Sequence, residues 1–200
     1  MVQNTSPKRG RPPSFDRDAV ISGAISAFFE KGYENTTLAD LEAATGVDRS
    51  TLYNSFEGKA GLYRSAAQAY VDVVMTELFD PLVNGEADDL SDVVSFLDRL
   101  EGSMRSDQFP TGCFIVNDLG SASRHQAATD RYIEALHRGL NGALARFGLT
   151  ATEVRQSRSE LLIGAVIGIN ALARHDQAKA LCVLDATRSL IKSWADGGNP

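Results

Sequence analysis

The chain of 200 residues has few of the residues that build metal centres, disulfide frameworks and membrane spans. Its two cysteines, Cys113 and Cys182, have no CxxC spacing, and its three histidines are scattered, so neither a zinc site nor a disulfide framework is expected. No apolar run is long enough for a membrane helix, and the amino terminus lacks the apolar core of a signal peptide. We therefore expect a protein of the reducing cytoplasm, with no metal, no cofactor and no membrane partner.

Motifs that carry common enzyme chemistry are also missing. There is no P-loop, nucleophile elbow, HExxH motif or paired Cys/His set, which makes an enzyme the least favoured class. Strand hairpins are absent as well, and apolar residues recur at helical spacing from residue 16 onward. The sequence predicts an all-α fold of about nine helices. They fall near 16–31, 37–45, 48–56, 59–79, 90–104, 113–119, 132–147, 152–174 and 177–194.

The net charge of −6 is unevenly distributed. Residues 1–64 hold eight Lys/Arg and eight Asp/Glu, whereas residues 65–200 hold twelve against eighteen and supply the whole −6. A neutral head with a basic tip on an acidic body is compatible with local contact to nucleic acid, because the acidic body stays off the phosphates.

The stretch from Thr37 to Lys59 organises the chain. Gly46 separates two short apolar sets at helical spacing, a pattern typical of a helix-turn-helix. Thr37 with Asp40 three residues later predicts a capping box, and Asp48 predicts the cap of the next helix. The apolar sets, which dock the two helices, are Leu38, Leu41 and Ala44, then Val47, Leu52 and Phe56.

Polar residues remain for the outer face of the second of these helices. Arg49 is the best candidate for reading a guanine, with a phosphate contact or a plain surface charge as the alternative. Ser50 and Thr51 lie on the first turn, and Thr51 is also compatible with facing the first helix. Asn54 suits either adenine or solvent. Lys59 opens the following helix, where its ammonium and the helix amino end both favour a phosphate over a purely exposed position.

The segment from Phe28 to Tyr63, FFEKGYENTTLADLEAATGVDRSTLYNSFEGKAGLY, resembles the TetR family of bacterial transcriptional regulators. The resemblance covers the first third of the chain and implies a DNA-binding helix-turn-helix. It implies a phosphate contact for Tyr53, against the alternative of a half-buried aromatic. Ser55 departs from the family pattern, in which His or Tyr at this position commonly contacts a phosphate. The phosphate contacts are therefore expected to come mainly from Thr37, Tyr53 and Lys59.

Residues 1–14 form a polar arm with cations around a glycine, including Arg9 and Arg11. Directly before a helix-turn-helix, such a segment favours insertion into a minor groove over a solubilising tail. The predicted organisation is a flexible arm (1–14), a three-helix DNA-binding domain (15–58), and a helical effector-binding and dimerisation domain (59–200).

In the body, aromatic and polar residues are candidates for an effector cavity, although aromatics at helical spacing are more often plain core. These candidates are Phe79, Phe96, Met104, Phe114, Asn117 and Tyr132. Cys113 is interpreted as a buried structural cysteine, with redox sensing as the alternative. The family pairs its last two helices with those of a second copy, against the alternative of an intrachain core. The residues predicted for this surface are Leu161, Gly164, Ala165, Gly168, Leu172 and Trp194.

These observations predict a ligand-responsive transcriptional regulator, most simply a repressor, that binds a near-palindromic operator as a homodimer. Its expected partners are double-stranded DNA, a second copy of itself and an unidentified small-molecule effector. The alternative is a helical protein-interaction domain that has lost DNA binding. The intact polar face from Arg49 to Asn54 disfavours that alternative.

Overall fold

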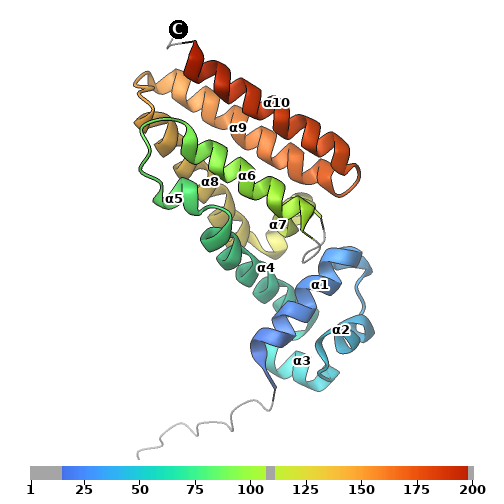
Figure 1. Cartoon of the computed structure of the whole chain (residues 1–200). Coiled ribbons are helices and arrows are strands. Elements are labelled where there is room, and N and C mark those ends of the chain that lie inside the picture. Colours follow the sequence, from blue (N-terminus) through green and yellow to red (C-terminus); the bar gives the residue numbers. More distant parts are fainter. Residues whose placement is uncertain (1–14, 107–110, 198–200) are drawn as a thin grey trace, which may run out of the picture.

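The computed structural model describes residues 15–106 and 111–197, and all regular secondary structure in these ranges is helical. Figure 1 shows a helical head at one end, a long helix leading out of it, and a helical body whose last helix ends at the opposite tip. The head and the connecting helix comprise α1 (Arg17–Asn35), α2 (Leu38–Thr45), α3 (Arg49–Phe56) and α4 (Gly58–Glu77).

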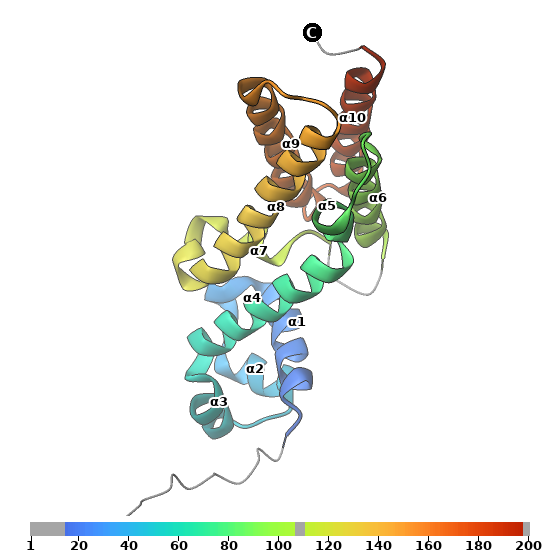
Figure 2. The same cartoon turned by 90° about the vertical axis from the view of Figure 1, so that its left-hand side faces the viewer.

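The body follows α4, and its last two helices, α9 and α10, lie side by side along one flank (Figures 1 and 2). Its elements are α5 (Asp80–Asn84), α6 (Ser91–Arg105), α7 (Phe114–Asn117), a 3-10 helix (Leu119–Arg124), α8 (Gln126–Arg146), α9 (Thr152–Ala173) and α10 (Gln177–Asp196).

The head closes around a small apolar core. Asp16 caps α1 by accepting hydrogen bonds from the amides of the first turn. Gly32 has φ +75°, which ends the main part of α1 before a last turn that runs to Asn35. Leu41 of α2 and Leu52 of α3 are fully buried, with α2 packed on α1 and α3 packed on α4. The apolar residues of the two short helices therefore pack in the core of the head, and their polar neighbours face solvent.

A close approach between α3 and α4 fixes how the head joins the connecting helix. A Cβ at Gly61 would lie 1.7 Å from the carbonyl oxygen of Phe56, so this contact requires glycine. Glu57, which links the two helices, is in the left-handed conformation with φ 61°. The end of α3 is thus held rigidly against the start of α4.

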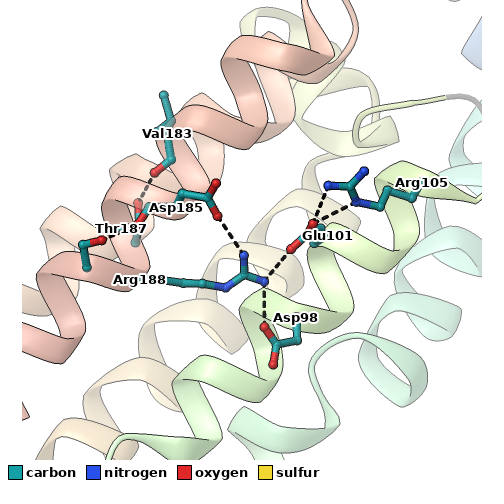
Figure 3. Close-up of polar contacts among 8 residues, drawn as sticks. Asp98, Glu101, Arg105, Val183, Asp185, Thr187 and Arg188 are labelled. Atoms are coloured by element: carbon teal, nitrogen blue, oxygen red, sulfur yellow. Dashed lines mark hydrogen bonds and ion pairs between the residues drawn. The ribbon is translucent and has the colours of Figure 1, made fainter.

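In the body, Phe79, Phe96 and Tyr132 form a buried aromatic cluster, with ring centroids 5.2–5.5 Å apart along the chain of contacts. A polar network on the flank ties α10 to α6 (Figure 3). The Arg188 guanidinium lies 2.6 Å from Asp98 and 2.7 Å from Glu101 on α6. This single side chain from α10 therefore clamps the middle of α6.

All nine expected helices occur in the described ranges, and the all-α prediction is confirmed. The short helix α5 lies between two of the expected helices and was not among the nine. Proline is tolerated in a first helical turn, and Pro81 occupies such a position in α5. None of the described helices has the length and apolarity needed to cross a membrane. Within these ranges, no group of three or more His, Cys, Asp or Glu residues is placed to hold a metal ion.

Candidate nucleic-acid interface and effector cavity

The amino end of α2 is fixed by the predicted capping box. The Thr37 hydroxyl accepts from the Asp40 amide at 3.1 Å, and the Asp40 carboxylate accepts from the Thr37 amide at 2.8 Å. Lys31 of α1 reaches the same carboxylate at 2.6 Å. The hydrogen bond from Lys31, reinforced by those from Thr37, holds the pKa of Asp40 well below its usual range. Asp40 is thus an ionised anchor between α1 and α2.

The turn into α3 is equally well defined. Gly46 adopts the left-handed conformation with φ 69° and closes α2, and Asp48 accepts from the Thr51 amide at 2.7 Å to cap α3. Glu42 of α2 accepts from the Arg49 amide at 2.8 Å, and its other carboxylate oxygen lies 3.7 Å from the Arg49 guanidinium. Sequence reasoning missed this brace, because it joins residues seven positions apart across the turn.

The outer face of α3 is polar and exposed. Arg49, Ser50 and Asn54 are all exposed, and the Asn54 amide donates to the Ser50 hydroxyl at 3.3 Å. Tyr53 keeps 55% of its surface exposed, with its ring lying against Gly58. Thr51 is half-buried, between this face and the core. Four of the five polar positions between Arg49 and Asn54 therefore form one accessible surface.

Lys59 lies on the first turn of α4, close to the end of α1. Its ammonium donates to the Glu34 carbonyl at 3.3 Å and sits 4.4 Å from the centroid of the Tyr33 ring. An ammonium has three N–H donors, so this contact leaves capacity for a phosphate. The predicted arm residues Arg9 and Arg11 lie outside the described residues.

Arg17 is a basic residue of the head that sequence reasoning did not single out. Its guanidinium donates to the Ser55 carbonyl at 3.3 Å and lies 4.3 Å from the centroid of the Phe56 ring. It therefore caps the carboxyl end of α3 from α1, where a cation is favoured by the helix dipole.

The head and the body meet at a junction formed by Tyr33, Tyr63, Asp118, Arg124 and His125. The Tyr63 hydroxyl donates to Asp118 at 2.8 Å. Burial and this hydrogen bond raise the pKa of Tyr63 far above its usual value. The Arg124 guanidinium lies 3.5 Å from Asp118 and 4.6 Å from the Tyr33 ring centroid. Side chains that follow α7 are thus in contact with the end of α1, just before the capping box.

The body holds a cavity of about 360 Å³ bounded by α4, α6, α8 and α9. Its polar lining includes Tyr70, Cys113, Tyr132 and Asn170, together with the charged residues Glu77 and Arg99. Of the residues predicted for an effector site, Tyr132 alone is in this lining. Phe79, Phe96 and Met104 lie in the core outside it. Phe114 and Asn117 line a second, smaller space of about 50 Å³ beside Tyr63.

Five of the six residues predicted for dimerisation lie on α9, and the sixth, Trp194, lies on α10. Leu161 is 51% exposed, and a Cβ at Gly164 or Gly168 would meet no heavy atom within 4 Å. Ala165 and Leu172 on the same helix are half-buried. Trp194 of α10 is half-buried, with the Arg158 guanidinium 4.6 Å from its ring centroid. This apolar stripe is only partly covered within one chain.

The head matches a known protein family, and most of the chain is similar in sequence to curated proteins. A family model described as "Bacterial regulatory proteins, tetR family" matches residues 20–66, which run from α1 into α4. The transcriptional repressor ComR of Escherichia coli is 31% identical over 160 residues, covering 80% of this chain and 74% of ComR. The transcriptional regulator YezE of Bacillus subtilis is 31% identical over 170 residues, covering 83% of this chain and 82% of YezE.

The fold is also found among solved structures. A cysteine mutant of the TetR family regulator CifR, complexed with 26bp double-strand operator DNA, superposes with a TM-score of 0.77. The superposition covers 92% of this chain and 100% of CifR, at 23% sequence identity. The likeness therefore extends over the body as well as the head.

Proposed function

From the premise that this chain belongs to the TetR family of bacterial regulatory proteins and is a DNA-binding transcriptional regulator, we propose that it is a homodimeric repressor released from its operator by a small molecule. The observation that carries the proposal is the exposed polar face of α3, which lies at the end of the molecule away from the body (Figure 1). In bacteria such a protein acts on the chromosome, so we place it in the cytoplasm.

The proposed reading of DNA assigns α3 to the major groove. Arg49 grips a guanine, and Ser50, Thr51 and Asn54 meet neighbouring base edges. Tyr53 and Lys59 contact phosphates on either side, and Thr37 brings the amino end of α2 to another phosphate. The arm carries Arg9 and Arg11 into the adjacent minor groove. The Glu42 brace supports this assignment, because it holds the first turn of α3 in one orientation.

A dimer is proposed because one short recognition helix reads too few base pairs to be specific. The exposed stripe of Leu161, Gly164 and Gly168 on α9 supports this proposal, since small residues allow a second helix to approach closely. The two heads then meet half-sites about 34 Å apart or a multiple of that spacing. The body is the effector-binding and dimerisation domain, and residues 15–58 are the DNA-binding domain.

The test is binding of the purified chain to fragments of its own promoter region at low salt. We expect Arg49→Ala to relax sequence preference, with a loss of about 1–3 kcal/mol on the preferred site. Lys59→Ala should weaken binding to all sequences alike and lower the salt slope by about 1. Arg138→Ala removes an exposed arginine of α8 and serves as the matched control.

Absence of binding to any promoter fragment would leave the alternative of an interaction domain without DNA binding. The reverse pattern, in which Lys59→Ala alters sequence preference and Arg49→Ala does not, would exchange the two assignments.

A further inference from the structure

The body cavity touches the head directly. Besides residues of the body, its lining includes Ile25 of α1, the helix against which α2 packs. Its volume of about 360 Å³ is near the lower end of the range for ligand sites, about 300–1,000 Å³. It therefore suits a single small ring with a short substituent.

Three polar groups meet inside this cavity. Cys113, Tyr70 and Tyr132 all line it, and the two tyrosines are near enough to affect the pKa of the thiol. Burial raises the pKa of all three groups, so each keeps its proton and remains neutral. A thiol sulfur is only a weak hydrogen-bond acceptor. Two phenolic groups, which are strong donors, thus stand beside a poor acceptor.

The buried part of the cavity wall is uncharged. Val74 and Leu100 supply buried apolar wall, and the two charged residues of the lining, Glu77 and Arg99, are both exposed. The Arg99 guanidinium is engaged by the Glu77 carbonyl at 2.6 Å and by Asp80 at 3.3 Å. An ion in the buried part of the cavity would lose its hydration without a buried counter-charge beside it.

We propose that this cavity binds a small, uncharged and largely apolar molecule whose carbonyl-type oxygen accepts hydrogen bonds from Tyr70 and Tyr132. The oxygen offers the two hydroxyls a stronger acceptor than the Cys113 sulfur, while the apolar remainder fills the space between Ile25 and Leu100. Aryl and alkyl ketones, aldehydes and esters belong to this class, whereas carboxylates and amines do not.

The role of such a ligand as the effector rests on the proposed function. Cys113 directly precedes α7, and Asp118 directly follows it, where it holds Tyr63 of α4. A ligand that accepts hydrogen bonds from the hydroxyls beside Cys113 and contacts Ile25 touches two elements that meet the head. These are the segment around α7, which holds Tyr63, and α1 itself. The ligand shifts the equilibrium only to the extent that it prefers one arrangement of these elements.

The experiment measures binding of four probes of similar size to the full-length protein by calorimetry, without DNA. Acetophenone is neutral with an acceptor, ethylbenzene is neutral without one, benzoate is an anion and benzylammonium is a cation. We expect acetophenone to bind at least about tenfold more tightly than the other three, since one or two hydrogen bonds separate it from ethylbenzene. Tighter binding of either ion, or no binding of acetophenone at millimolar concentration, would overturn the proposal.

Two conservative variants locate the site. Tyr70→Phe and Tyr132→Phe should each weaken acetophenone about fivefold to tenfold and leave ethylbenzene unchanged, which shows that the cavity is intact. Equal affinity of acetophenone for both variants and the original chain would overturn the assignment of the donors. Release of a bound promoter fragment by acetophenone is measured separately, because its failure would count against the effector role and not against the ligand class.

Discussion

The hydroxyl of Tyr63 on α4 donates a hydrogen bond of 2.8 Å to the carboxylate of Asp118, which follows α7. The two residues are 55 positions apart. They join α4 to the segment around α7, which begins at Cys113 in the lining of the body cavity. Around them lie Arg124 and His125, so this contact is the centre of the junction between head and body.

Removing the Tyr63 hydroxyl should destabilise the fold. Tyr63→Phe leaves a partly buried carboxylate without its closest donor, so we expect a loss of about 1–3 kcal/mol in the free energy of unfolding. Urea denaturation measures it. Tyr53→Phe, which removes a hydroxyl from a ring that is 55% exposed, should change stability by less than about 0.5 kcal/mol. Equal effects of the two variants would contradict a role for the Tyr63–Asp118 contact.

Removing the charge of Glu42 should reduce selectivity for DNA sequence. Glu42→Gln keeps an oxygen for the Arg49 amide but loses the attraction to the Arg49 guanidinium, which lies 3.7 Å away. We expect tighter binding to all DNA at low salt, by about twofold to tenfold, with the larger gain on unrelated sequences. Fluorescence anisotropy on promoter and scrambled duplexes gives the ratio. Glu153→Gln, at the exposed start of α9, should leave that ratio unchanged.

Two glycines in helices should respond to alanine with opposite signs. Gly61→Ala places a Cβ 1.7 Å from the Phe56 carbonyl oxygen, and we expect a loss of about 1–3 kcal/mol or more. Gly102 of α6 has open space at this position, so Gly102→Ala should gain about 0.5–1 kcal/mol from its helix propensity. Thermal unfolding of both variants checks the pair. A stable Gly61→Ala protein would show that α3 and α4 are not held in the contact described.

Stability should fall as the pH drops from about 7 to 5 because of His125. Burial lowers the pKa of His125 from its usual value near 6.5, although Asp118 opposes this effect. The unfolded chain therefore takes up a proton at a pH where the folded chain resists it, and protonation favours unfolding. The group faces Tyr63, Asp118, Arg124 and Thr129.

The pH effect is measured by urea titration at several pH values. His125→Gln should flatten the change between pH 7 and 5, whereas His175→Gln, at an exposed position, should preserve it. An unchanged slope in His125→Gln would assign the acid sensitivity to another group.

The head was predictable from sequence because its signals are local. Thr37, Asp40, Gly46 and Asp48 act on neighbours within four positions, and the structure confirms each cap and turn. Helix periodicity likewise located the long helices of the body. The brace of Glu42 on Arg49 and the stacking of Lys59 on Tyr33 depend on how two helices meet, and no spacing rule indicates them.

The cavity was the least predictable feature. Phe79 and Phe96 have the size and apolarity of ligand contacts, yet they pack against each other in the core. Tyr70 and Ile25 line the cavity, although no motif in the sequence marks either of them as a site residue. Whether a stripe faces a filled core or an open space depends on the volumes of side chains from other helices. That balance is a property of the assembled fold.

The clamp of Arg188 on Asp98 and Glu101 has a consequence for concentration dependence. The helix α6 forms a wall of the cavity, and α10 belongs to the pair proposed to meet a second copy. Free energies of coupling between sites are reciprocal, so a contact that transmits the cavity's shape to α10 also transmits subunit association to the cavity. Dilution that separates the two copies should therefore change how tightly each one holds its small molecule.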